Sequence, residues 1–130
     1  MATSKKIDLS KIALHHKIWL ETPDGKGILG DGKWQILKAI EQTGSLTAAC
    51  RHLGLTYRRT WGDLKKIEQM LNIQLLEKSR GGKEGGMSCL SPEGRKMVTA
   101  FDEFHQSVDD TIEKAMEVFK TKITEIKPEK

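Results

Sequence analysis

The residues best suited to binding chemistry in this sequence are basic side chains clustered in its middle third. Arg58 and Arg59 stand together, and Lys65 and Lys66 follow within two helical turns. Residues 51–83 carry eight Lys and Arg against three Asp and Glu, whereas residues 101–130 carry five against eight. A local basic excess favours contact with a polyanion such as nucleic acid. A solvated charged face has the same composition, so charge alone leaves both interpretations open.

The basic cluster falls on the second of two short predicted helices. Ser45 is an N-cap candidate for the first helix, and Gly54 supplies the positive φ that a tight turn needs after it. Ala49, five residues before Gly54, is small enough to let the helices approach closely. Thr56 caps the second helix. Its expected buried stripe recurs at three- and four-residue steps and consists of Trp61, Leu64, Ile67 and Leu71. This is the helix-turn-helix pattern.

The expected exposed first turn of the second helix carries side chains of the kinds that can read DNA. An arginine side chain presents a planar fork that matches two acceptors on a guanine edge, while Thr and Tyr reach phosphates or a thymine methyl. After this helix, a strand ending at Lys78 leads into a glycine-rich loop over residues 81–86, and a strand over residues 87–90 returns. With Arg80 and Lys83, this hairpin is a predicted wing that touches phosphates or the minor groove.

The flanking segments predict the rest of the fold. Alternation over residues 16–21 and the turn at Pro23-Asp24-Gly25 indicate a β-hairpin that returns over residues 27–30. Asp31 is the expected N-cap of a helix that ends at Gly44. Ser91 and Pro92 begin a long final helix. Its apolar residues recur at the ordinary helical period for about seven turns, which is more than one small core needs, so part of the stripe is expected to cover a second subunit.

Several runs resemble the N-terminal DNA-binding domain of ModE-type molybdate-dependent regulators and, more loosely, the winged helix-turn-helix of LysR-type regulators. They are Gly44-Ser45-Leu46-Thr47-Ala48-Ala49, residues 53–61, Arg80-Gly81-Gly82-Lys83-Glu84-Gly85-Gly86 and Leu90-Ser91-Pro92-Glu93-Gly94. The resemblance covers roughly residues 14–120. It implies a homodimer whose recognition helix and wing bind DNA. The oxyanion-binding domains of that family are not in this sequence, so we expect no small-molecule effector to bind within it. Glu84 departs from the family's more glycine-rich wing and weakens a phosphate contact there.

Other classes of protein find little support. No stretch approaches eighteen apolar residues, and the N-terminus lacks an apolar signal region, so we expect a cytoplasmic protein that does not span a membrane. No set of residues suggests catalysis, a metal site or a cofactor, and we expect none. Cys50 is expected in the core and Cys89 on a wing strand, with a redox role for either left open. Trp19, Trp34 and Trp61 are expected to be core anchors.

The sequence therefore predicts a mainly α (α+β) winged helix-turn-helix with an N-terminal β-hairpin and a long C-terminal dimerisation helix. We expect a flexible arm over residues 1–13, the DNA-binding domain over 14–91, the long helix over 92–124 and a frayed tail over 125–130. The expected function is a homodimeric transcriptional regulator that binds double-stranded DNA sequence-specifically. The alternatives are a protein-interaction module and a non-specific architectural DNA-binding protein. The residues expected to contact DNA are Ser45, Thr56, Tyr57, Arg58, Arg59, Thr60, Lys65, Lys66, Arg80 and Lys83. Those expected at the dimer interface are Phe101, Phe104, Val108, Ile112 and Phe119.

Overall fold

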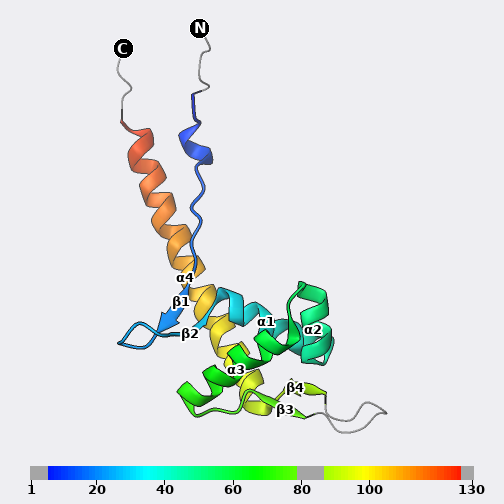
Figure 1. The fold of residues 1–130 in the computed structure, drawn as a ribbon. Coiled ribbons are helices and arrows are strands. Elements are labelled where there is room, and N and C mark those ends of the chain that lie inside the picture. The colour runs from blue at the N-terminus through cyan, green and yellow to red at the C-terminus, as the bar shows by residue number, and fades with distance from the viewer. Residues whose placement is uncertain (1–5, 79–86, 127–130) are drawn as a thin grey trace. The chain divides into compact units, whose positions relative to one another are not determined.

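The computed structural model describes residues 6–78 and 87–126 (Figure 1). Within these ranges the chain is mainly helical, with two small β-hairpins. The elements in order are a 3₁₀ helix η1 (Leu9–Lys11), strands β1 (Trp19–Glu21) and β2 (Gly27–Gly30), helices α1 (Asp31–Thr43), α2 (Leu46–Leu53) and α3 (Tyr57–Leu71), strands β3 (Leu76–Lys78) and β4 (Ser88–Leu90), and helix α4 (Pro92–Thr124). The predicted fold, from N-terminal hairpin to long last helix, is confirmed.

The chain divides into two compact units. The larger comprises Lys17–Glu103 and holds the helix-turn-helix, the two hairpins and the first turns of α4. The smaller joins the residues up to His16 to α4 from Phe104 onward. The boundary thus falls inside α4, three turns beyond the start of the helix.

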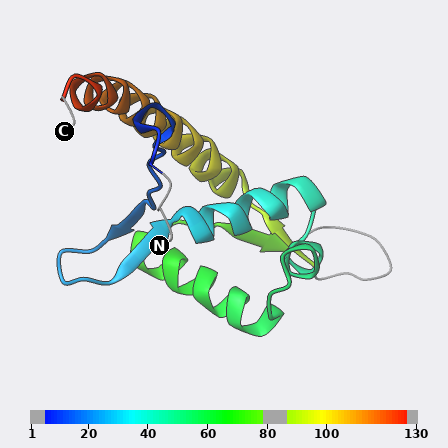
Figure 2. The same ribbon diagram turned by 90° about the horizontal axis from the view of Figure 1, so that it is seen from above.

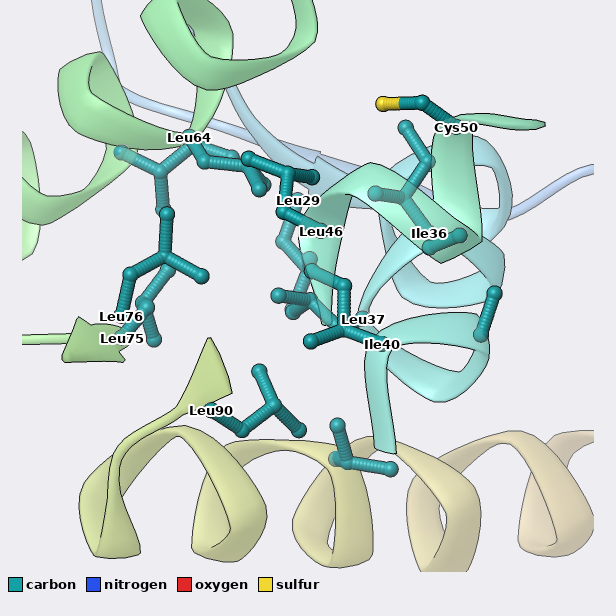
Figure 3. Packing of buried hydrophobic residues seen from close by; sticks show 14 of the residues in the cluster. Leu29, Ile36, Leu37, Ile40, Leu46, Cys50, Leu64, Leu75, Leu76 and Leu90 are labelled. Atoms are coloured by element: carbon teal, nitrogen blue, oxygen red, sulfur yellow. The ribbon is translucent and has the colours of Figure 1, made fainter. Parts of the chain in front are cut away.

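One apolar core holds the larger unit together (Figure 3). Leu37 and Ile40 of α1 point toward the same centre as Leu46 of α2 and Leu64 of α3, and all four are almost completely buried. Leu75 and the paired strand residues Leu76 and Leu90 complete the core from the wing side; other members come from β2 and α4. Because α3 and both wing strands supply side chains to the same core, helix α3 and the wing rest on a common support.

Helix α1 begins differently from the prediction. Asp31 was expected as its N-cap, but the N-cap is Gly30, which makes no side-chain cap bond, and Asp31 is the first helical residue. The Asp31 carboxylate instead accepts a hydrogen bond from the backbone N–H of Ile18 at 3.1 Å, while the Asp31 N–H donates to the Ile18 carbonyl at 2.9 Å. The residue therefore joins the helix to the chain that enters β1.

The start of α4 is fixed against the wing and α1. Ser91 caps it as predicted, because its Oγ accepts from the N–H of Gly94 at 2.9 Å. An added Cβ at Gly94 would meet the Leu75 carbonyl oxygen at 2.4 Å, so only glycine allows this approach. Further along, the Trp34 indole N–H donates to Asp102 at 2.6 Å and the Trp34 ring packs on Phe101. Phe101 was expected at the dimer interface, but it is buried in the core of this unit.

In the smaller unit, the N-terminal segment runs beside α4 (Figure 1). Asp109 holds two histidines: His16 Nε2 lies 3.3 Å and His105 Nδ1 2.9 Å from its carboxylate oxygens. Ile12 and Leu14 share a cleft with Ile112 and Met116 of α4. Part of the apolar face of α4 is thus covered by the chain's own N-terminal segment. No helix in the described ranges has the length and apolar character needed to cross a membrane.

Candidate nucleic-acid interface

The turn between α2 and α3 is built by local chemistry that the sequence predicted. Ser45 Oγ accepts from the N–H of Ala48 and begins α2, and Gly54 ends it at a φ of 69°. The backbone N–H of Leu55 donates a hydrogen bond to the Cys50 carbonyl oxygen at 2.8 Å. Ala49 is completely buried, as its small size suggested. From this turn α3 runs away from α2, so the N-terminal end of α3 lies nearest to α2, as Figure 2 shows from above.

The first turn of α3 exposes its basic side chains. Tyr57, Arg58 and Arg59 are all exposed, and in the described part of the chain no carboxylate lies within ion-pair distance of either arginine. Thr56 occupies the N-cap position, but its side chain makes no cap hydrogen bond. These four residues present two charged forks and two hydroxyls on one exposed helix end.

Two of the expected contact residues have buried side chains. Thr60 was expected on the exposed face but retains only 5% of its accessible surface, because it belongs to the stripe that packs with Leu64 and Ile67. Ser45 is also buried, and its hydroxyl is used by the α2 cap. The side chain of neither residue is available to a ligand in this conformation.

Trp61, in contrast, was expected to be buried but is exposed. It was expected in the core, yet it is 41% exposed, as is Tyr57 one turn earlier. The Lys65 ammonium lies 5.5 Å from the centre of the Trp61 ring. Trp19 is also exposed, whereas Trp34 packs against the core. The indole of Trp61 is therefore exposed on α3, three residues after Arg58 and four after Tyr57, a placement that apolar periodicity did not reveal.

Lys65 and Lys66 have different surroundings. The ammonium of Lys65 pairs with Glu68 at 3.0 Å, so this lysine is already engaged within α3. Lys66 is exposed and lines a cleft of about 590 Å³ between α3 and the β1–β2 hairpin, together with Trp19 and Met70. The two neighbouring lysines thus extend to different sides of the helix.

Glu68 connects α3 to the wing, a role that the sequence did not suggest. One carboxylate oxygen accepts hydrogen bonds from the backbone N–H groups of Leu75 and Leu76 at 2.7 and 2.9 Å. Burial alone would raise the pKa of Glu68, but these hydrogen bonds and the Lys65 ammonium together lower the pKa below its ordinary value. The carboxylate therefore keeps its charge to a lower pH than an ordinary glutamate, and it joins the first wing strand to the last turns of α3.

The wing is an antiparallel hairpin in the predicted place. Leu76 pairs with Leu90 and Lys78 with Ser88. Lys78 is exposed at the end of β3, where the connection begins. The expected contact residues Arg80 and Lys83 lie outside the described residues.

Cysteine and metal chemistry contribute nothing visible to this surface. Cys50 is buried, as expected, and Cys89 is half-buried on β4; both are free thiols. In the described ranges, no three His, Cys, Asp or Glu side chains are grouped in a way that could hold a metal ion.

Two short helices joined by a positive-φ glycine and followed by a hairpin define a winged helix-turn-helix. Residues 32–95 match the family described as bacterial regulatory helix-turn-helix protein, lysR family. The matched region is similar to LysR-type helix-turn-helix DNA-binding domains, and about half of the chain is distantly related to the N-terminal region of ModE transcriptional regulators.

Three relatives are similar to part of this chain. The chain is 34% identical over 73 residues to the molybdenum-pterin-binding protein MopB of Rhodobacter capsulatus. The aligned residues make up 56% of this chain and 27% of that protein. It is 29% identical over 68 residues to the transcriptional regulator ModE of Haemophilus influenzae, covering 52% and 27%. It is 28% identical over 94 residues to the molybdenum transport protein ModE of Azotobacter vinelandii, covering 69% and 35%. The match thus spans about a quarter to a third of these relatives.

Proposed function

We propose that this protein is a transcriptional regulator that binds duplex DNA sequence-specifically by placing α3 in the major groove. The observation that carries the proposal is the exposed first turn of α3, where Arg58 and Arg59 have no carboxylate partner among the described residues. Arginine forks in this position of a helix-turn-helix pair with guanine edges. Thr56 and Tyr57 contribute hydroxyls to phosphates or bases.

The wing contacts the backbone beside the major groove. Lys78 brings an exposed positive charge to the end of β3, and Arg80 and Lys83 continue the basic run in the sequence. Because Glu68 holds β3 to α3, the distance between the two DNA contacts is set within the domain.

The regulator acts as a homodimer through α4. Phe104 and Phe119 are 42% and 51% exposed, and the half-buried Val108 lies on the same apolar stripe between them. Val118, next to Phe119, is 56% exposed. Apolar side chains exposed along several turns of one helix favour association with a second copy. A two-fold dimer would place two recognition helices in successive major grooves. The N-terminal segment leaves a narrower stripe for this contact than the sequence suggested, since Ile112 also lines its cleft.

The direct test is selection of bound sites from random duplex DNA. We expect a motif with two related half-sites separated by about one helical turn. An Arg58→Ala and Arg59→Ala double variant should lose the motif, while Arg95→Ala, which removes an exposed charge on α4, should retain it. Selection that enriches no motif while duplex is still bound would support an architectural protein instead.

Salt dependence separates DNA binding from a protein-interaction role. If several phosphates are contacted, the logarithm of affinity falls linearly and steeply with the logarithm of salt concentration. A protein that binds no duplex at low salt would contradict the proposal.

A further inference from the structure

We propose that Trp61 contacts DNA directly, with its indole packed against the C5-methyl group of a thymine in the major groove, and that Gly62 is the point of closest approach between α3 and the base edges. This inference rests on the DNA-binding function proposed above and assigns two further specificity-determining residues to the same surface.

The first observation is the position of the indole. Trp61 lies three residues after Arg58 and four after Tyr57, and residues at these spacings are neighbours on a helix surface. All three side chains are exposed. A surface that receives the side of α3 that bears Arg58 therefore also meets the exposed part of Trp61.

The second observation is how the indole is held. The Lys65 ammonium lies 5.5 Å from the ring centre, and the same ammonium is fixed by Glu68 at 3.0 Å. A cation near the ring is attracted to the electron-rich π-system. Lys65 thus restrains the indole, and less rotamer entropy is lost when a ligand packs on the remaining surface.

The third observation is Gly62. Glycine is unfavourable within a helix, and neither a positive φ nor a steric conflict explains it here, because an added Cβ would meet nothing within 4 Å among the described atoms. Gly62 lies four residues after Arg58, on the side of α3 away from the buried Leu64 and Ile67. A missing side chain at such a position allows another molecule to approach the helix backbone closely.

The chemistry favours a thymine methyl as the partner of the indole. In the major groove, this methyl is the apolar feature that protein side chains contact on a base edge. The arginines supply the polar contacts, whereas Trp61 offers a rigid apolar surface of the kind that dominates binding energy at interfaces. Arg58 and Trp61 would then read different features of neighbouring base pairs.

The test removes thymine methyl groups one at a time. In the selected site, each thymine is replaced by deoxyuridine, and the affinity of the wild-type protein is measured by fluorescence anisotropy. We expect one position in each half-site to weaken binding about fourfold, the equivalent of one buried methyl group. Trp61→Ala should bind at least tenfold more weakly and should no longer respond to deoxyuridine at that position. Trp19→Ala, which removes another exposed indole of the same unit, should keep both the affinity and the response.

Gly62→Ala provides an independent test. The free protein should unfold at an unchanged or higher temperature, since the added methyl meets open space and alanine favours the helix. Its affinity for the same site should fall on the order of tenfold, because the methyl would collide with DNA. Weaker binding by a variant of equal or greater stability cannot arise from misfolding.

The outcomes distinguish this inference from the proposed function. Failure to select any duplex motif would remove the proposed function itself. A normal motif with no deoxyuridine-sensitive position, or equal sensitivity in wild type and Trp61→Ala, would overturn the methyl contact. Unchanged affinity of Gly62→Ala would overturn the close approach. The deoxyuridine scan on the wild-type protein still tests the methyl contact if Trp61→Ala folds poorly. In that case Trp61→Phe replaces Trp61→Ala in the comparison.

Discussion

Replacing Gly94 with alanine should destabilise the larger unit by forcing the start of α4 away from the wing. The new Cβ would stand 2.4 Å from the Leu75 carbonyl oxygen and 3.3 Å from a methyl of Leu90. Carbon and oxygen normally approach to about 3.3–3.6 Å, so a shift of about 1 Å is needed. The Leu75 carbonyl also accepts a hydrogen bond from the Ser91 N–H at 2.8 Å, so it cannot move without disturbing the helix cap.

The magnitude follows from two opposing effects. Overpacking a well-packed site costs about 1–3 kcal/mol. Alanine favours a helix over glycine by about 0.5–1 kcal/mol, which offsets part of that loss. We therefore expect the free energy of unfolding to fall by about 1–2 kcal/mol, and the melting temperature by about 4–8 °C.

Urea unfolding followed by circular dichroism measures this change, with each variant at the same protein concentration. Gly62→Ala is the matched control, because it adds the same methyl to a helical glycine with open space around it. Its free energy of unfolding should rise by up to about 1 kcal/mol. Equal effects of the two substitutions would refute the argument that the close approach of α4 to the Leu75 carbonyl restricts residue 94 to glycine.

Three further predictions test the proposed DNA contacts, the contribution of Glu68 to folding stability at different pH, and the proposed dimer. Arg58→Ala and Arg59→Ala should each weaken binding to the selected site by about 1–3 kcal/mol and relax specificity at one base pair, as measured by competition with single-base variants; unchanged binding in both would contradict the recognition-helix assignment. Because the pKa of Glu68 is lowered by folding, its contribution to stability is complete above its ordinary pKa and is lost as the pH falls through the folded value. Glu68→Gln should therefore be less stable than wild type near neutral pH, with a gap that narrows in acid unfolding experiments; a gap independent of pH would refute this role. Phe119→Glu should dissociate the dimer in sedimentation equilibrium while the exposed control Thr121→Glu leaves it intact, and a monomeric wild type would remove the proposed interface.

The sequence predicted well those features that depend on a few adjacent residues. The cap at Ser45 and the turns at Gly44 and Gly54 follow from local hydrogen bonding and backbone geometry, and the structure has all three. The hairpins were likewise signalled by turn residues and alternation. Such features are visible without knowledge of the tertiary contacts.

The buried face of α3 was harder to predict because two stripes share Leu64. Trp61 and Leu64 lie three residues apart, and Thr60 and Leu64 lie four apart, so both pairs fit a helical period. Hydrophobicity favoured Trp61, but the structure buries Thr60. The choice depends on a rotation of about one residue around the helix axis, which is set by packing against the whole core. The bond from Glu68 to Leu75 was hidden for a related reason, since it crosses a turn whose geometry the sequence does not specify.

The carboxylate of Glu68 also defines which part of this protein can be exchanged as a unit. It joins the last turns of α3 to the backbone of Leu75 and Leu76, so the recognition helix and the first wing strand share one rigid connection. A chimera that receives only the first turn of α3 would inherit base contacts but keep the wing geometry of its host. A graft from Thr56 through Leu76 would carry its own spacing between groove and backbone contacts. For redesign of DNA specificity, the transferable module is therefore the helix together with its wing anchor.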